Sequence, residues 1–285
     1  MKANTSSIYK SIIIVCITSL LIFISDQWMQ HQLQAAEFKP SIELVEFNSN
    51  GTKNSDRLST TSISTRSVKR SFASTQAYQT TKAFEAYRPK YYRAAIDPSN
   101  YGDRYSTDVH GRTLNNQPIA VLHETVGSAT SAINTFRRHN TNDNHQSSYH
   151  ALITLDGTIV YLVPSNKRAF GAGNSAFKSS QSLETVQTNP NLAASVNNFA
   201  YHISLETPLD GRNKSGNSYH SGYTDSQYKS LAWLLALSSI PDDRITTHQA
   251  VDLSGNRFDP RSFDFDKFFA ILHTYRQPNS NKVSI

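Results

Sequence analysis

The alternation of strand-like and helix-like segments in the second half of the chain is the feature that most constrains its fold. Apolar runs at 119–123 and 199–205 predict buried strands, and the polar residues 171–198 between them predict a long loop. Asp156-Gly157 separates two further apolar runs, which predicts a β-hairpin with a tight two-residue turn.

Helical spacing accompanies these strands. Residues 128–138 and 265–272 place apolar side chains three or four positions apart. Thr224 and Gln227 form the capping-box pattern that opens a helix, and Pro241 ends it. Since strands that alternate with helices pack in layers around one core, we expect an α/β fold with a central mixed β-sheet flanked by helices.

The first 36 residues have the pattern of an export signal. Lys2 and Lys10 give the segment a positive start before the apolar run 12–24. This run is shorter than the roughly 20 residues that span a bilayer. Small residues at 35–36 could be cleaved, but they lie well past the run, so an uncleaved anchor in the inner membrane is the alternative. We expect an exported protein of the periplasm or cell wall.

Residues 37–98 are rich in Ser and Thr and show no sustained apolar period, which predicts a basic, unstructured tether. The aromatic-rich part from 84 to 105 either begins the domain or packs across its back. We place the folded domain at 99–277, acting as a monomer, and a flexible tail at 278–285.

The net charge of +6 is unevenly distributed. Residues 37–98 carry a surplus of four basic residues, whereas residues 99–285 carry a surplus of one. The folded region is therefore nearly neutral, which argues against a nucleic-acid binder. The basic surplus suits either weak attraction to an anionic surface or simple solvation of the tether.

Three residues near predicted strand ends could hold zinc. His123 ends an apolar strand, His248 follows a β-branched run, and Asp259 precedes Pro260, which favours an extended backbone. Imidazole and carboxylate are zinc ligands, and a catalytic zinc takes three protein ligands and a water. Each residue alone has an ordinary structural role, so the hypothesis rests on their conjunction. The single cysteine, Cys16, excludes a cysteine-rich site.

Such a site would be suited to amide hydrolysis. A zinc-bound water has a pKa of about 7, and the metal polarises a carbonyl. Arg257, two residues before Asp259, could stabilise the oxyanion of a tetrahedral intermediate, or form a surface ion pair instead. The remaining histidines, apart from His150, are expected to be solvated or structural.

The order of several short blocks between 117 and 269 resembles the zinc-dependent N-acetylmuramoyl-L-alanine amidases of the type 2 class. These enzymes are related to peptidoglycan recognition proteins and amidase-type phage lysozymes. The blocks are Leu122-His123-Glu124-Thr125, Ser148-Tyr149-His150 with Asp156-Gly157-Thr158-Ile159, Arg168-Ala169-Phe170 with Gly173, His202-Ile203-Ser204-Leu205-Glu206, Thr247-His248, and Arg257-Phe258-Asp259-Pro260.

The resemblance implies zinc on His123, His248 and Asp259. It also implies catalytic roles for Tyr149 and Glu206, although Glu206 could instead be a strand-end carboxylate in an ion pair. The family's catalytic Lys corresponds to Arg257. Arginine keeps the charge but does not readily release a proton, so an oxyanion role fits better than a general-acid role.

Four positions depart from the family pattern. Gly171 replaces a substrate-side His, Ser204 replaces a Gly, Arg261 replaces the Gly after Asp-Pro, and Arg257 replaces the Lys. The resemblance implies an exported peptidoglycan hydrolase that cleaves the amide between N-acetylmuramic acid and L-alanine of the stem peptide. The departures keep open the alternative of a non-catalytic peptidoglycan-binding module.

Overall fold

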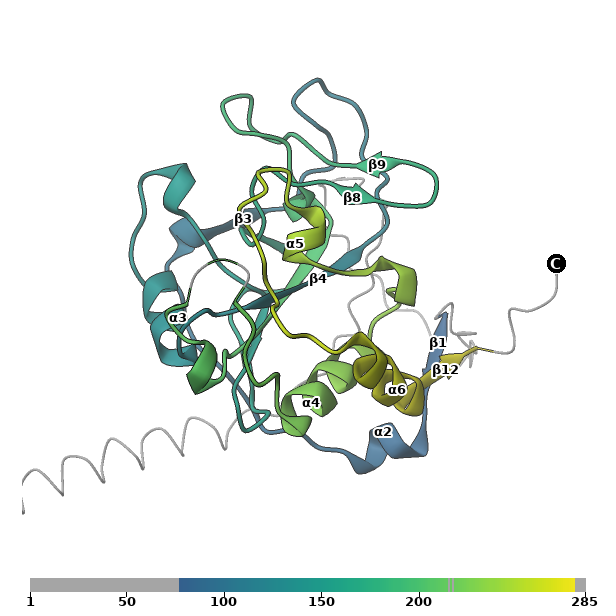
Figure 1. Ribbon diagram of the computed structural model, residues 1–285. Helices are drawn as coiled ribbons and strands as arrows, with labels where there is room; N and C mark the ends of the chain where they lie inside the picture. Colours follow the sequence, from purple (N-terminus) through teal and green to yellow (C-terminus); the bar gives the residue numbers. More distant parts are fainter. Residues whose placement is uncertain (1–76, 215, 217, 280–285) are drawn as a thin grey trace, which may run out of the picture. The chain divides into compact units, whose positions relative to one another are not determined.

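The computed structural model describes residues 77–214, 216 and 218–279 (Figure 1). The expected export signal, most of the expected tether and most of the expected tail lie outside the described residues. Among the helices that are described, none is long and apolar enough to cross a bilayer.

A six-stranded mixed sheet organises the described chain, in the order β11-β4-β10-β5-β6-β2. β4, β10, β11 and β5 are parallel, β5 and β6 are antiparallel, and β2 joins β6 in parallel. The predicted mixed sheet is therefore confirmed. The strands are β2 (Tyr91–Arg93), β4 (Ile119–Glu124), β5 (Ala151–Ile153), β6 (Ile159–Tyr161), β10 (Ala200–Leu205) and β11 (Ile245–Thr247).

The two longest strands, β4 and β10, lie at the centre of the sheet. Every residue of β4 is buried, because elements cover both faces of the sheet, and this explains its continuous apolar run. The register pairs His123 with Ser204, so these two side chains project from the same face.

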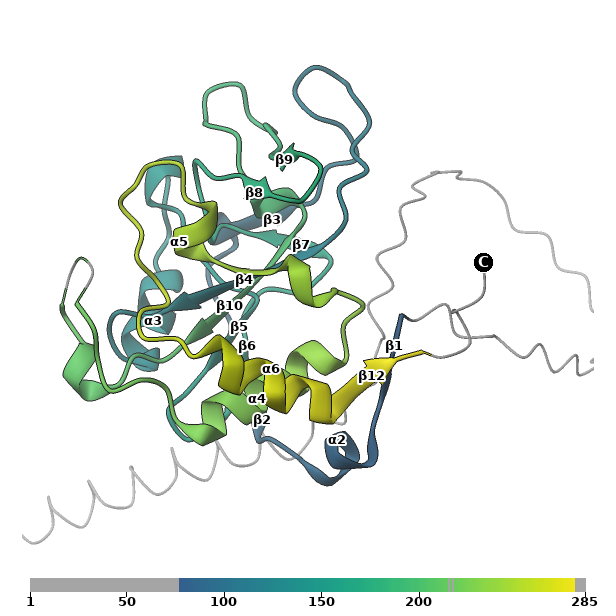
Figure 2. The ribbon, with the colours of Figure 1, turned by 45° about the vertical axis from the view of Figure 1, so that its right-hand side comes forward.

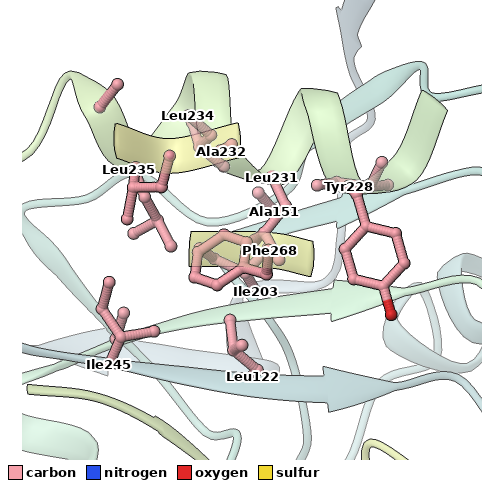
Figure 3. Close-up of a cluster of buried hydrophobic side chains, with 14 of the residues drawn as sticks. Leu122, Ala151, Ile203, Tyr228, Leu231, Ala232, Leu234, Leu235, Ile245 and Phe268 are labelled. Carbon is pink, nitrogen blue, oxygen red and sulfur yellow. The ribbon is translucent and has the colours of Figure 1, made fainter. Parts of the chain in front are cut away.

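One face is covered by α4 (Asp225–Ala236), α6 (Phe265–Tyr275) and α2 (Lys82–Ala86). The predicted capping box is present, with Thr224 and Gln227 bonding to each other's backbone N–H groups. Figure 3 shows the core beneath these helices, where side chains of α4 and α6 meet those of the sheet. The core includes Leu122, Ala151, Ile203, Leu231 and Phe268.

The other face carries α3 (Ala129–Phe136), α5 (His248–Val251) and two small sheets, β3–β7 and β8–β9 (Figure 2). Their strands are β3 (Tyr101–Asp103), β7 (Lys167–Ala169), β8 (Phe177–Lys178) and β9 (Leu183–Glu184). The segment expected to be a loop at 171–198 therefore contains a short hairpin. The 3-10 helices are η1 (Pro98–Asn100), η2 (Asp143–His145), η3 (Val196–Asn198), η4 (Leu209–Gly211) and η5 (Asp242–Arg244).

The predicted hairpin joins β5 to β6, but its turn is longer than expected. The Thr154 N–H donates to the Thr158 carbonyl at 3.0 Å, which leaves three residues in the loop. Gly157 alone of these three has a positive φ, of 85°. This geometry is typical of three-residue hairpin loops, in which one residue adopts the left-handed conformation.

The folded domain begins earlier than residue 99, so the expected boundary is wrong. β2 is an edge strand of the central sheet, and β1 (Tyr78–Thr80) pairs with β12 (Arg276–Pro278), one residue into the expected tail. Phe84 anchors this segment by stacking on Trp233, with ring centroids 5.4 Å apart. Such isolated aromatic anchors produce no periodic pattern, which is why the composition indicated a tether.

Candidate functional site

The three expected metal ligands converge at one edge of the central sheet. His123 lies near the end of β4, and His248 begins α5 directly after β11. Because Thr247 pairs with Leu122 in parallel, both histidines reach the carboxyl ends of neighbouring strands. Asp259 comes from the segment between α5 and α6, and the N–H of Gln249 donates to its carbonyl at 3.0 Å.

The donor atoms have the separation that a shared metal ion requires. One ligand atom from each of the three residues lies within 4.8 Å of the others. His123 Nδ1 is 3.3 Å from Asp259 Oδ2, and His248 Nδ1 is 3.0 Å from Asp259 Oδ1. A tetrahedral zinc about 2.1 Å from each ligand holds its ligand atoms about 3.4 Å apart. Two imidazoles and one carboxylate therefore fit zinc in both chemistry and spacing.

Near pH 7, His123 is neutral and Asp259 is ionised, and these are the states in which imidazole and carboxylate bind metal. Burial lowers the pKa of His123 to about 4, so the ring is neutral near pH 7. Burial alone would raise the pKa of Asp259, but its contacts with His123 and His248 outweigh this and hold the pKa below its usual range. Within the described chain, the only polar atom that His123 Nδ1 faces is Asp259 Oδ2, and their contact lacks full hydrogen-bond geometry, so both atoms can turn to a shared ligand.

Two further histidines form a chain of contacts with His123. His123 Nε2 lies 2.9 Å from His202 Nδ1, and the backbone N–H of His202 donates to His150 Nδ1 at 2.9 Å. His202 is fully buried, so it is not solvated, and it directly contacts a proposed ligand. Strand alternation could have placed residues 202 and 204 on one face, but only the register of β10 against β4 shows that this face carries His123.

Tyr149 packs against the expected ligand His123, with ring centroids 4.7 Å apart. Phe136 holds the tyrosine ring from another side, at a centroid distance of 5.3 Å. Burial, together with the negative charge of Asp259, raises the pKa of Tyr149 above its usual range. The phenol therefore keeps its proton at neutral pH and can donate a hydrogen bond.

Arg257 lies on an exposed loop, two residues before Asp259. The carboxylate of Asp252 accepts the backbone N–H groups of Ser254, Asn256 and Arg257, and so shapes the loop. In the part of the chain that is described, the Arg257 guanidinium forms no ion pair or hydrogen bond. After burial, which is the main cause, its positive charge adds slightly to the lowering of the His123 pKa and offsets a small part of the rise in the Tyr149 pKa, so Arg257 lies near both groups.

Glu206 is held in the ion pair that was the alternative to its catalytic role. Its Oε1 accepts hydrogen bonds from the Ala129 N–H at 3.0 Å and from Arg212 at 2.8 Å. Its Oε2 accepts one, from the Leu155 N–H at 3.0 Å. A carboxylate has about four acceptor positions, so one position on Oε2 is left. Glu206 follows Ser204 by two residues and shares the face of His123.

Glu124 belongs to a separate, buried network on the other face of β4. Its carboxylate accepts hydrogen bonds from Arg261, from His220 at 3.1 Å and from Tyr223 at 3.0 Å. Arg261 also donates to the carbonyls of Gly211, Lys214 and Ser218. The arginine that departs from the family pattern therefore ties the 207–222 segment to the end of β4.

The region that contains these residues matches a known protein family. A family model described as N-acetylmuramoyl-L-alanine amidase matches residues 115–262, more than half of the 285 residues. This range contains the three expected ligands as well as Tyr149, Glu206 and Arg257. A search of curated proteins finds no match.

Several solved structures resemble the chain. A crystal structure of a selenomethionine AmpD derivative is 24% identical, with a TM-score of 0.45, over 66% of this chain and 97% of that one. The amidase LysC from Clostridium intestinale is 19% identical, with a TM-score of 0.40, over 65% and 99%. Citrobacter freundii AmpD is 22% identical, with a TM-score of 0.38, over 65% and 90%. At these scores the family match, rather than the structural likeness, carries the assignment.

Proposed function

The chain belongs to the N-acetylmuramoyl-L-alanine amidase family, and from this premise we propose that it is an exported, zinc-dependent peptidoglycan hydrolase. Its substrate bond is the amide between N-acetylmuramic acid and L-alanine of the stem peptide. The observation that carries the proposal is the convergence of His123, His248 and Asp259, whose donor atoms lie within 4.8 Å of one another. This is a three-ligand donor set of the kind that catalytic zinc uses.

His123, His248 and Asp259 would hold the metal through two imidazole nitrogens and one carboxylate. Zinc bound there would supply a water with a pKa near 7 and would polarise the amide carbonyl. Burial keeps His123 neutral and its Nδ1 faces the other proposed ligand, Asp259, so the imidazole needs no net loss of a proton to bind metal near pH 7.

Tyr149 and Arg257 are suited to stabilise the oxyanion that forms when the amide carbonyl is attacked. The Tyr149 hydroxyl keeps its proton because burial and the Asp259 charge raise its pKa. Arg257 brings a permanent positive charge that the described residues do not neutralise. Donors that are already in place contribute most where water is excluded, as it is beside the buried His123.

Glu206 is the better of the two candidates for orienting the attacking water and accepting its proton. A phenol with a raised pKa is a poor acceptor, which assigns Tyr149 to the donor role. Glu206 retains one acceptor position on Oε2, while three hydrogen bonds fix the orientation of the carboxylate. The proton would then pass from Oε2 to the leaving amine of L-alanine.

Export of this enzyme is the part of the proposal that rests on sequence alone. Lys2, Lys10 and the apolar run 12–24 support a signal that leads to the periplasm or cell wall, where peptidoglycan lies. If the run is retained, it would attach a monomeric enzyme to the inner membrane.

The test uses the purified full-length protein on intact peptidoglycan sacculi, with zinc and after chelation. Mass spectrometry would follow stem peptides that gain a free L-alanine amino terminus. We expect zinc-dependent release, and a loss of at least about 10³-fold in His248→Ala, because the variant lacks a ligand.

Two results would contradict the proposal. Release at the same rate after chelation, or wild-type turnover by folded His248→Ala, would exclude a zinc mechanism at this site. A zinc-loaded protein that sediments with sacculi but releases no peptide would instead support a peptidoglycan-binding module.

A further inference from the structure

We infer that His202 is a positioning residue for the metal site, which holds His123 with its Nδ1 directed at the metal. The inference rests on the proposed zinc site and names a contact partner of one ligand. His123 Nε2 and His202 Nδ1 are 2.9 Å apart, and both rings are fully buried. The sequence predicted only that His202 lies in a strand and is solvated or structural.

The proton positions in this histidine chain follow from His150. The backbone N–H of His202 can only donate, and it lies 2.9 Å from His150 Nδ1, so Nδ1 is the acceptor and the hydrogen of the neutral ring sits on Nε2. His150 Nε2 then donates to the Lys167 carbonyl at 3.1 Å, and the Arg104 guanidinium, 3.2 Å from the same nitrogen, is a neighbour that cannot accept this hydrogen. The hydrogen bond from the His202 N–H fixes the backbone of β10 at the point from which the His202 ring projects.

The same reasoning assigns the proton between His202 and His123. A histidine binds metal through an unprotonated nitrogen, and the nitrogen of His123 that faces Asp259 is Nδ1, 3.3 Å away. In the metal-binding form the hydrogen of His123 therefore sits on Nε2 and is donated to His202 Nδ1. A hydrogen bond to the far nitrogen sets the tautomer and ring orientation of a metal-binding histidine.

Gly171 provides the space that the His202 ring occupies. A Cβ added at residue 171 would lie 2.5 Å from both Cγ and Nδ1 of His202, closer than real side chains approach. Gly171 is not among the described glycines with a positive φ, so space rather than backbone conformation requires a glycine here.

The experiment compares His202→Asn with His202→Leu in the full-length protein. Asparagine places its amide oxygen near the position of Nδ1 and can accept from His123, whereas leucine has nearly the same size and accepts nothing. Zinc would be removed and its affinity measured by competition with a chromophoric chelator, with visible absorption of bound Co²⁺ reporting ligand geometry.

We expect His202→Leu to weaken zinc binding by about 10- to 100-fold and to change the Co²⁺ spectrum. We expect His202→Asn to stay within about 3-fold of wild type, since the hydrogen bond is kept. Wild-type affinity in His202→Leu, or equal losses in both variants, would overturn the inference. A wild-type protein that binds no zinc would overturn the proposed metal site itself, and the positioning role with it.

A second measurement uses Gly171 and remains informative if His202→Leu does not fold. Gly171→Ala should weaken zinc binding in the wild-type background, because its Cβ displaces the His202 ring. The same substitution should have little effect in a His202→Ser background, where the ring is absent. Equal effects in the two backgrounds would show that Gly171 does not act through His202.

Discussion

His123 and Glu124 are consecutive residues of β4, but they lead into networks of opposite character. On the Glu124 side, both carboxylate oxygens accept hydrogen bonds, and His220 uses both ring nitrogens, one toward Glu124 and one toward the Gly222 N–H. On the His123 side, the described residues leave His202 Nε2 without a hydrogen-bond partner, and they give His123 Nδ1 and Ser204 Oγ only loose contacts with Asp259 and Tyr149.

The difference separates a structural network from a functional one. A buried polar atom without a partner costs about 1–3 kcal/mol, so stability alone would not favour a cluster of buried polar atoms that are weakly bonded or unbonded. Strand alternation sends His123 and Glu124 to opposite faces, which lets the chain keep both kinds of network at one strand end. Incomplete hydrogen bonding marks the side that is open to a ligand.

The largest effect is expected from breaking the Glu124 side. Glu124→Leu leaves Arg261, His220 and Tyr223 without their shared acceptor, and Arg261 as a buried charge with no counter-ion. We expect a loss of about 3–5 kcal/mol in the free energy of unfolding, measured by urea denaturation of the metal-free protein.

The matched control is the double variant Glu124→Leu with Arg261→Met. Because it removes both charges together, its loss should be smaller than the sum of the single losses. Additive losses would mean that the two residues do not act as a pair.

Variants on the His123 side should change turnover rather than stability. Glu206→Gln and Tyr149→Phe each remove one proton-handling group, and we expect each to lower kcat by about 10²-fold, or about 2.7 kcal/mol. Unfolding free energy should change by only about 1 kcal/mol in Glu206→Gln, because Arg212 stays partly exposed to water and the glutamine amide oxygen can still accept a hydrogen bond although residue 206 is buried. Unchanged kcat with lower stability in Glu206→Gln would make that residue structural.

The smallest effect per residue is expected on the free energy of unfolding as the pH is lowered. Burial lowers the pKa of His123 to about 4 and of His150 to about 3, and it lowers that of His202 as well. In the unfolded chain these rings titrate near 6.5, so the unfolded state binds more protons below that pH. Stability is therefore full above about pH 6.5 and falls as the pH is lowered, by about 1 kcal/mol per histidine between pH 6.5 and 5.5.

Urea denaturation in the presence of a chelator, at several pH values, measures this slope. His150→Asn should reduce it, because the variant removes one of the three buried rings. A free energy of unfolding that is constant between pH 6.5 and 5.5 would contradict the neutral state of the three histidines. Asp259 acts in a separate window, because its lowered pKa removes stability only as the pH falls below about 3.8.

The sequence alone was sufficient for the elements whose pattern is local. β4, β10, the hairpin and the capped helix α4 were all predicted, because alternating or continuous apolar runs and Thr224–Gln227 capping need no distant partner. The N-terminal boundary was missed, because β2 depends on pairing with β6, which lies far along the chain.

The sequence by itself determined which residue types could hold a metal, since His123, His248 and Asp259 each lie beside a recognisable strand end or proline. Only the tertiary structure decided what surrounds them. Residues 79 positions apart in sequence, His123 and His202, meet through the register of two parallel strands. Glu124 and Arg261, 137 positions apart, meet on the other face. Ligand type is a property of single side chains, whereas a hydrogen bond between strands depends on a register that no local pattern specifies.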